Sequence, residues 1–553
     1  MKTDAFMAQL KKRAEARPAA LWCGALVLVI AVLFATGAPM GGAFSWPDSP
    51  RHALNGAFVK DLIGAAPFAD PTGYAYDYYS QYPALTILFY PPFFSFILAF
   101  FYALFGVSQE TAVFVLFLFH AALACGVFAF ARLWLQRPAA FGAALIVAAA
   151  PEVAFWGRQV MLDMPAMSFL IWSAFFFVRH MRGGRIVDLY LAAALVVFAA
   201  HMKMSMVFMA APFAIALFQA QGRAMFRNKH HYIIAGLALA GLAPLIFIMA
   251  FFGQGNMQSV SGISDSVVAR FSVEGWLWYL ARLPEQFGWT SFAAFVAAAG
   301  VLAYRARRAR LKIDNGLFLA AWFGVGYLFF SSIDLKEVRF TIHLLPPLAI
   351  IIGLGAEALF ARRRLAAQAV MIAAGAAAVL VTVATRPVHF VDGYKDVVAY
   401  VSEIAPRNSN ILFSGFRDGA FIFNMRAHSD RPDLSIVRAD KLLLRIAIRP
   451  GLGVEQKDYA RDEIQQMIGD LAVHYVVAQP DFWTHLEQMD RLQTVLRSDA
   501  FEEVARFRTP ANYNAQEKEL ILYKNLGEVA EGPVEITNEL LIINRNVSGT
   551  IAN

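Results

Sequence analysis

Long runs of apolar residues, separated by short basic loops, dominate the first 385 residues of this sequence. The chain has 553 residues, of which 58% are hydrophobic and 16% charged, and its mean hydropathy is +0.50. A soluble domain has about half apolar and about a quarter charged residues. Because about 18 apolar residues are enough to cross a bilayer, these runs predict a polytopic α-helical membrane protein.

The apolar segments and the basic loops between them give a path through the membrane. The segments cover residues 20–38, 88–106, 110–130, 138–154, 163–178, 187–201, 205–220, 232–252, 290–304, 315–332, 340–360 and 366–385. The basic clusters are Lys11/Lys12/Arg13, Arg132/Arg137, Arg179/Arg182/Arg185, Arg223/Arg227/Lys229, Arg305/Arg307/Arg308/Arg310 and Arg362/Arg363/Arg364. Basic loops stay in the cytoplasm, so we predict that the N-terminus is cytoplasmic, with a retained first helix, and that residues 39–87 and those after 386 lie outside.

Between the outer loop 39–87 and the cytoplasmic cluster at Arg132, the chain must cross the membrane an odd number of times. Crossings at both 88–106 and 110–130 would make this number even. Segment 88–106 opens with Tyr90-Pro91-Pro92-Phe93, and a double proline disrupts a helix that continues through it. We therefore predict that this segment lies along the outer interface, which leaves eleven crossings. The expected fold has about 11–13 transmembrane helices, with juxtamembrane helices in the first outer loop.

The composition changes near residue 386, where charged residues become frequent. Strand-like stretches at 410–413, 473–478 and 519–523 alternate with helical patterns at 460–471 and 483–497. Strands that alternate with helices predict an α/β fold. We therefore expect a transmembrane domain at 1–386 and a soluble extracytoplasmic α/β domain at 387–553.

Several function classes find no support in the sequence. The net charge of +7 comes from the basic loops, so it does not indicate nucleic-acid binding. Cys23 and Cys125 both lie in apolar segments, which argues against a disulfide framework. No His or Cys spacing indicates a metal site, and we expect no cofactor.

The predicted path places charged residues from four different loops at the outer face. They are Asp48, Arg51, Arg158, Asp163, Lys203, Asp334, Lys336, Glu337 and Arg339. Ionisable residues near a membrane need partners or a task. Each one singly is as consistent with a solvated loop charge, but their shared side favours a site.

Asp48 precedes a predicted short interfacial helix at 51–64. Ser49-Pro50 has the pattern of an N-cap followed by proline at the first helical position, and the helix dipole favours a carboxylate nearby. Such a carboxylate suits acceptance of a proton from a hydroxyl group, or a simple capping role. The tyrosines of 67–87, including Tyr82, can stack on sugar rings; an interfacial aromatic belt explains most of them.

The remaining charges have alternative readings as well. Arg158 and Asp163 frame a helix start, as an ion pair or as part of a site. Lys203 can be a snorkelling anchor or a ligand of a lipid phosphate. Lys336 and Arg339 together can hold a phosphate, because the lysine ammonium acts as a point charge and the arginine guanidinium donates two parallel hydrogen bonds.

Five stretches in order resemble motifs of the GT-C superfamily of glycosyltransferases, which includes protein O-mannosyltransferases, the lipid A aminoarabinose transferase and rhizobial galacturonosyltransferase-like proteins. Asp48-Ser49-Pro50-Arg51-His52-Ala53 resembles the family motif Asp-Glu-x-Arg-Tyr-Ala, and Tyr90-Pro91-Pro92-Phe93 resembles Lys-Pro-Pro-Leu-Tyr. Arg158 to Pro165 resembles the motif Arg-x-x-x-x-Asp-x-Pro. Lys203 stands where the family has Lys-Gly-Pro, and Lys336 to Pro346 resembles Lys-x-x-Arg-Tyr-x-x-Pro. The chain departs from the family at Ser49, Tyr90, Met204 and Ser205. The matches cover roughly the first 350 residues.

The resemblance implies transfer of a sugar, with inversion, from a polyprenyl-phosphate carrier to an extracytoplasmic lipid, glycan or protein. It implies that Asp48 is the general base and that Asp163 orients the acceptor or the base. Arg51 would contact substrate, as would Tyr82 of the tyrosine-rich stretch.

The resemblance also assigns a shared role to four cations. Arg158, Lys203, Lys336 and Arg339 would stabilise charge on the leaving phosphate. The implied setting is a bacterial inner membrane, with membrane lipids around the helices. A transporter or flippase of lipid-linked sugars, and a non-catalytic membrane scaffold, are the alternatives; the departures at Ser49 and Tyr90 keep the scaffold open.

Overall fold

The computed structural model describes residues 2–37, 43–261, 268–309, 313–447, 450–540 and 545–551. Arg310 of the fifth basic cluster lies outside these ranges. The chain divides into two compact units. Unit 1 comprises residues 1–38, 116–246 and 266–388, and unit 2 comprises residues 39–115, 247–265 and 389–553.

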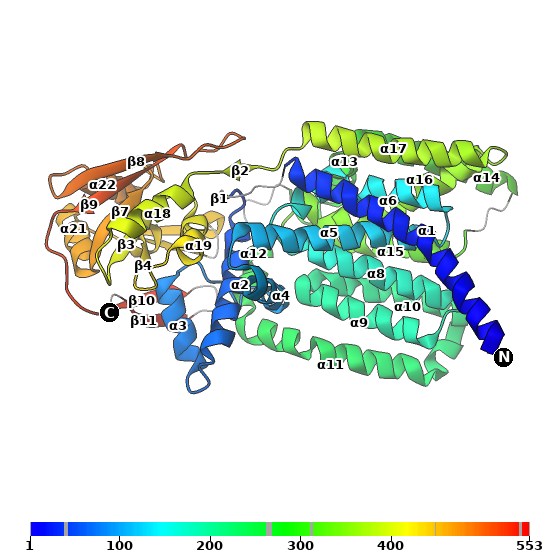
Figure 1. The fold of residues 1–553 in the computed structure, drawn as a ribbon, viewed down its shortest axis with the longest axis horizontal. Helices are drawn as coiled ribbons and strands as arrows, with labels where there is room; N and C mark the ends of the chain where they lie inside the picture. The colour runs from blue at the N-terminus through cyan, green and yellow to red at the C-terminus, as the bar shows by residue number, and fades with distance from the viewer. Residues whose placement is uncertain are drawn as a thin grey trace. The chain divides into compact units, whose positions relative to one another are not determined.

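Unit 1 is helical throughout its described residues (Figure 1). Its elements are α1 (Lys2–Ala35), α5 (Gln109–Ala131, which begins in unit 2), α6 (Arg137–Ala148), α7 (Pro151–Gly157), α8 (Asp163–Met181), α9 (Ile186–Met202), η1 (Met204–Met209), α10 (Ala210–Gln221), η2 (Gly222–Arg227), α11 (Lys229–Phe252, which ends in unit 2), α13 (Val273–Phe287), α14 (Trp289–Ala309), α15 (Gly316–Ser331), η3 (Val338–Leu344), α16 (Leu345–Leu359) and α17 (Arg364–Thr385).

Small residues let helices of unit 1 approach closely. A Cβ atom added at Gly142 of α6 would lie 2.2 Å from the carbonyl oxygen of Met371 in α17. A Cβ atom added at Gly375 of α17 would lie 2.9 Å from the carbonyl oxygen of Gly142. Backbone contact through small residues is the usual way in which membrane helices pack.

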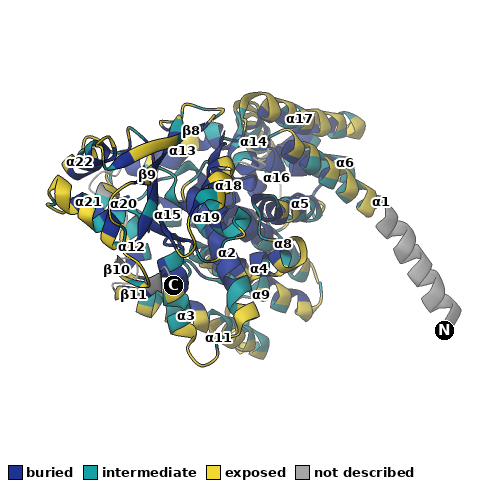
Figure 2. Ribbon diagram, turned by 60° about the vertical axis from the view of Figure 1, so that its left-hand side comes forward, coloured by how far each residue is buried: buried dark blue, intermediate teal, exposed yellow. Residues whose placement is uncertain are grey.

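The helices have the lengths and surfaces of membrane spans. Within the described residues, six helices are long and apolar enough to cross a bilayer, or seven if α6 and α7, which are bent by 66°, count as one span. Large apolar residues stay exposed on α11, as Leu237 (60%) and Leu239 (63%) illustrate. Figure 2 shows exposed stretches (yellow) on this helix. The predicted membrane class is confirmed, whereas the number of 11–13 crossings remains a prediction.

Unit 2 combines the first outer loop with the C-terminal α/β fold. Its helices are α2 (Asp48–Ala65), α3 (Pro71–Gln81), α4 (Phe93–Phe105), α12 (Gln254–Val260), α18 (Tyr394–Ile404), α19 (Asp418–His428), α20 (Ala439–Leu443), α21 (Arg461–Asp470) and α22 (Glu487–Leu496), with η4 at Pro450–Leu452. Its strands are β1 (Ala43–Phe44), β2 (Phe390–Val391), β3 (Asn410–Ser414), β4 (Ser435–Arg438), β5 (Leu444–Ile446), β6 (Val454–Gln456), β7 (Val473–Ala478), β8 (Phe501–Arg508), β9 (Glu519–Asn525), β10 (Val534–Leu540) and β11 (Arg545–Ile551).

A mixed five-stranded sheet in the order β4-β3-β7-β9-β8 forms the centre of the C-terminal part. Strands β4, β3 and β7 are parallel, and β9 is antiparallel to both β7 and β8. All five residues of β3 are buried, as expected for a strand covered on both faces. The predicted strands at 410–413, 473–478 and 519–523 are confirmed as β3, β7 and β9.

The start of α2 differs from the sequence expectation. The predicted N-cap at Ser49 is wrong, because the helix begins at Asp48 with Pro47 at the cap position. Residues 52–59 are all buried. The helix is therefore part of a protein core and lacks the single apolar face of an interfacial helix.

Helix α4 begins directly after the double proline, as the sequence predicts. Its 13 residues span roughly 20 Å at 1.5 Å per residue, which is less than the ~30 Å of bilayer hydrocarbon. It packs against α2, where a Cβ atom added at Gly56 would lie 2.5 Å from Cβ of Leu98. This length supports the prediction that 88–106 does not cross the membrane.

Candidate active site

Three sequence motifs meet in unit 1 to form one buried ionic cluster, which we call the Asp163 cluster: Asp163, Lys203, Glu337 and Arg339. Lys203 Nζ donates a hydrogen bond to Asp163 Oδ1 at 2.5 Å. Arg339 Nη1 lies 3.9 Å from Asp163 Oδ2, and Arg339 Nε donates to Glu337 at 2.5 Å. The sequence predicted that Asp163, Lys203 and Arg339 would share one face; the structure brings them into direct contact.

The chain path explains how these charges meet. Asp163 is the first residue of α8, and Lys203 follows directly after α9. Helices α8 and α9 pack against each other as a hairpin, so the start of the first helix lies beside the end of the second. Arg339 comes from the η3 segment that leads into α16.

Aromatic rings pack against the two cations of the Asp163 cluster. The Arg339 guanidinium lies over the Trp156 ring at 4.6 Å, and Lys203 Nζ lies 4.6 Å from the Phe340 ring centre. The Asp163 side chain is 6% exposed and that of Lys203 is 21% exposed. Charges that are largely removed from water interact strongly. Lys203 is more accessible to solvent than Asp163.

Lys336 lies in the same loop region but bonds to backbone. Its ammonium donates hydrogen bonds to the carbonyl oxygens of Ser331 and Ile333, at 2.5 and 2.6 Å, just past the end of α15. Burial lowers the pKa of this ammonium. The contacts make Lys336 a cap for helix carbonyls, and its predicted phosphate contact remains a prediction.

Arg158 ties together helix ends of unit 1. Its guanidinium donates to the carbonyl oxygens of Ala154, Leu33 and Arg386 at 2.8, 3.2 and 3.0 Å. Burial lowers the pKa of Arg158 to about 10. These bonds favour a positioning role; the predicted role at a leaving phosphate stays a prediction.

We expect Arg158→Lys to destabilise the protein by about 2–4 kcal/mol, because an ammonium cannot reach three separate carbonyl groups. Thermal unfolding in detergent measures the change, with the exposed Arg362→Lys as the matched control. If Arg158→Lys instead leaves the unfolding temperature unchanged and raises KM for the donor, the residue binds substrate.

Asp48 lies in unit 2, in the first turn of α2, and is partly exposed. One helical turn on, Arg51 donates to both carboxylate oxygens of Asp418, at 3.0 and 3.2 Å. Asp418 also pairs with Arg438 at 2.6 Å. Burial alone would raise the pKa of Asp418, but Arg438 and Arg51 outweigh it and lower the pKa to about 2. Arg51, a predicted substrate ligand, therefore has a fixed carboxylate partner.

Tyr82 ends α3 inside a cluster of aromatic rings. Its ring centre lies 5.0 Å from that of Tyr78, which lies 5.0 Å from Phe58. Burial raises the pKa of Tyr82 to about 12. The side chain is 7% exposed, so the structure gives it a core role, and sugar contact remains a prediction.

Sequence reasoning missed the C-terminal partners of the first outer loop. Asp418 is the first residue of α19, and Arg438 ends β4. Both are ordinary charged residues at the end of an element. Nothing in their local pattern indicates a partner that is 367 residues away, as Arg51 is from Asp418.

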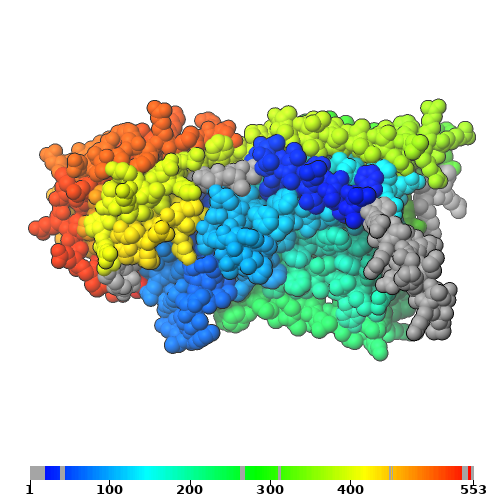
Figure 3. Space-filling view, in the orientation of Figure 1, coloured from blue at the N-terminus to red at the C-terminus, as the bar shows by residue number. Residues whose placement is uncertain are grey.

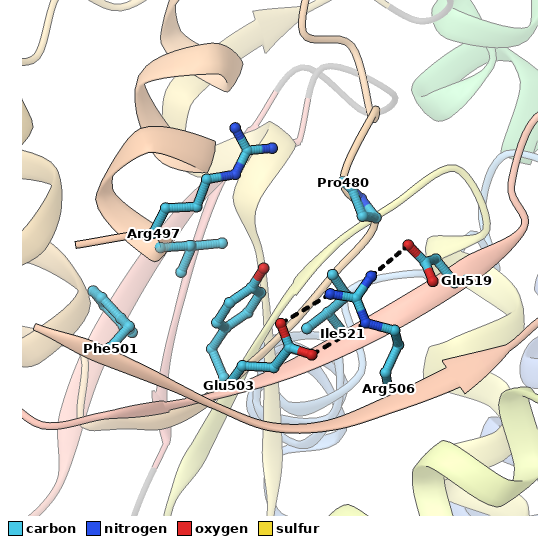
Figure 4. A pocket seen from close by; sticks show the side chains of 9 residues that line it. Pro480, Arg497, Phe501, Glu503, Arg506, Glu519 and Ile521 are labelled. Carbon is cyan, nitrogen blue, oxygen red and sulfur yellow. Dashed lines mark hydrogen bonds and ion pairs between the residues drawn. The ribbon is translucent and has the colours of Figure 1, made fainter. Parts of the chain in front are cut away.

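The C-terminal fold also has a surface hollow of about 380 Å³ beside β8 and β9 (Figure 4). Arg506 crosses it and pairs with Glu503 and Glu519, so the charges compensate one another. None of the predicted site residues lines it. Within the described ranges, no three His, Cys, Asp or Glu side chains are placed to hold a metal ion.

Residues 90–248 match the model of the PMT_2 family, dolichyl-phosphate-mannose-protein mannosyltransferase. No curated protein matches the sequence. Solved structures share the fold. ArnT from Cupriavidus metallidurans bound to undecaprenyl phosphate has a TM-score of 0.60 at 14% identity, over 93% of this chain and 99% of that one.

The other two structures are larger proteins. The Archaeoglobus fulgidus oligosaccharyltransferase has a TM-score of 0.53 at 11% identity, over 90% of this chain and 76% of that one. The arabinofuranosyltransferase AftD from Mycobacteria has a TM-score of 0.53 at 15% identity, over 94% of this chain and 42% of that one. Residues 90–248 therefore resemble this mannosyltransferase family, and most of the chain shares the fold of these three solved structures.

Proposed function

We propose that this enzyme transfers a sugar from a polyprenyl-phosphate carrier to a hydroxyl group of an acceptor outside the cytoplasm, with inversion at the anomeric carbon. The observation that carries the proposal is the Asp163 cluster, in which Lys203 and Arg339 converge on one buried carboxylate. Two cations in a water-poor site suit a leaving group that gains negative charge. The fold shared with ArnT bound to undecaprenyl phosphate supports a lipid phosphate as that group.

The reaction is a single displacement. The acceptor oxygen attacks the anomeric carbon and forms the new glycosidic bond, while the bond from that carbon to the phosphate oxygen breaks. The electron pair of the broken bond leaves with the polyprenyl phosphate, and the hydroxyl proton passes to the carboxylate of Asp48. Lys203 and Arg339 stabilise the leaving phosphate, and Asp163 holds both cations in place between turnovers.

The charge pattern of the loops supports an orientation of the chain in the membrane. We infer a bacterial plasma membrane, with the N-terminus in the cytoplasm and residues 387–553 in the periplasm. Lipid, glycan and protein acceptors are all compatible with this placement. The membrane explains the fold, because the carrier's tail stays in hydrocarbon while its phosphate stays at the interface.

Purified protein in proteoliposomes tests the proposal directly. Undecaprenyl-phosphate-linked sugars are offered one at a time, with detergent-solubilised envelope lipids as a source of acceptors, and free undecaprenyl phosphate is measured. We expect release with at least one donor, dependent on the acceptor extract. Donor that crosses the bilayer without release of the carrier would instead indicate a flippase.

A further inference from the structure

The chain on both sides of Asp48 is held by residues from the C-terminal third of the protein, all within unit 2. On the upstream side, β1 pairs with β2, joining Phe44 to Phe390. Arg417 donates hydrogen bonds to the carbonyl oxygens of Phe44 and Ser45. The Phe44 ring packs edge-on against Phe423 of α19, with ring centres 5.3 Å apart.

On the downstream side, the first turn of α2 meets the first turn of α19. Arg51 donates to both oxygens of Asp418. Asp418 keeps its second partner, Arg438, and the side chains of Arg51, Asp418 and Arg438 are 20%, 13% and 11% exposed. Gly419 completes the contact, because a Cβ atom there would lie 3.0 Å from Cγ of Pro50.

The two anchors leave Asp48 on a short piece of chain that is fixed at each end. Figure 1 shows α2 beside α19, and Figure 3 shows the surface of the first outer loop (blue) meeting that of residues near 400–440 (yellow). A largely buried carboxylate that pairs with two arginines is a stiff connection, because hydrogen bonds between charged groups are roughly twice as strong as neutral ones. The position of Asp48 therefore depends on residues that lie more than 340 positions later in the sequence.

We propose that the Asp418–Arg438 pair, together with Arg417, is a positioning device that fixes the Asp48-bearing start of α2, and that this is a task of the C-terminal domain. The inference rests on the proposed role of Asp48 as the base. A general base must be within about 3 Å of the proton that it accepts, and an error of 1 Å in position can cost about a hundredfold in rate. Asp418 acts through α2 and is not itself a catalytic residue.

Amide hydrogen–deuterium exchange of the full-length protein in nanodiscs tests this without a known donor. In Asp418→Asn, we expect exchange of the amides of residues 49–54 to become faster by roughly tenfold, since local opening becomes easier. Asp433→Asn is the matched control, because Asp433 also pairs with an arginine, Arg431, within the same fold. The control should leave residues 49–54 unchanged.

A second variant keeps the test decisive if Asp418→Asn fails to fold. Gly419→Val keeps every charge but pushes against Pro50, and it should also speed exchange at the start of α2. Unchanged exchange at 49–54 in both variants would overturn the proposal. Equal acceleration in Asp433→Asn would overturn it as well, because the effect would then be a general loosening.

Turnover of whichever undecaprenyl-phosphate sugar is accepted gives the second readout. Asp418→Asn should lower kcat by about a hundredfold and leave KM for the donor within twofold, and Asp418→Glu should recover most of kcat. Loss through KM alone would contradict a positioning role. If Asp48→Asn proves fully active, the proposed base is wrong, and the exchange data still decide whether the device exists.

Discussion

Asp48→Asn is expected to lower kcat for sugar transfer by roughly 10²–10⁴-fold, the range that a positioned general base contributes. Asparagine keeps the size of the side chain and its ability to accept a hydrogen bond, but it cannot take the proton. KM for the donor should change little, because Asp48 acts on the acceptor hydroxyl. Initial rates of undecaprenyl phosphate release, at saturating donor, measure the effect.

Asp77→Asn is the matched control for this change. Asp77 is an exposed carboxylate on α3, in the same unit as Asp48. Its loss should leave the rate within twofold of wild type. Equal rates for Asp48→Asn and wild type, with unfolding temperatures that agree, would remove Asp48 from the mechanism.

The second large effect is expected on stability, at the Asp163 cluster. Asp163→Asn leaves the charge of Lys203 without its carboxylate partner, whereas Arg339 keeps Glu337. Removal of one partner of a buried ion pair costs about 3–5 kcal/mol, because the remaining charge is left uncompensated. Thermal unfolding in detergent, at constant lipid content, measures this loss.

Asp188→Asn provides a control in the same pair of helices. Asp188 of α9 pairs with Arg179 of α8, but the Arg179 side chain is 44% exposed. Water can solvate Arg179 after the carboxylate is lost, so this change should cost about 1 kcal/mol or less. A loss for Asp163→Asn that is no larger than for Asp188→Asn would contradict the expected energetics of the cluster.

The double variant Asp163→Asn/Lys203→Gln separates stability from catalysis. With both charges removed, part of the stability should return, and a double-mutant cycle gives the coupling energy. Transfer should not return, because Lys203 is proposed to stabilise the leaving phosphate. Recovery of both properties together would show that the cluster is structural only.

Sequence periodicity located many elements of the fold, although strands such as β4 and β8 were not predicted. The apolar runs mark the helices of unit 1, and β3, β7 and β9 appear where strand-like stretches occur in the sequence. The motif residues Asp163 and Lys203, expected on one face, lie in contact because a helix hairpin brings its two open ends together.

Tertiary pairing was not visible in the sequence. A cation at a helix end can bind either a phosphate or backbone carbonyl oxygens. The sequence therefore predicted Arg158 and Lys336 as phosphate ligands, whereas in the structure both donate to backbone carbonyl oxygens. The pairing of Arg51 with Asp418 has no local signature either, because it depends on packing between distant segments. The start of α2 at Asp48 depends on the same packing.

The pairing of the first outer loop with the end of the chain has a consequence for biogenesis. Arg51 is synthesised 367 residues before Asp418, and α3 contacts β11, which ends at Ile551. At about 5–20 residues per second, the ribosome needs on the order of 20–100 s to make what lies between. During that interval the loop, which includes buried residues such as Leu54 and Phe58, can pack against α4 but lacks its C-terminal partners. Nascent chains of this protein therefore have a period of vulnerability to proteases and aggregation, which lasts until these C-terminal partners have been made.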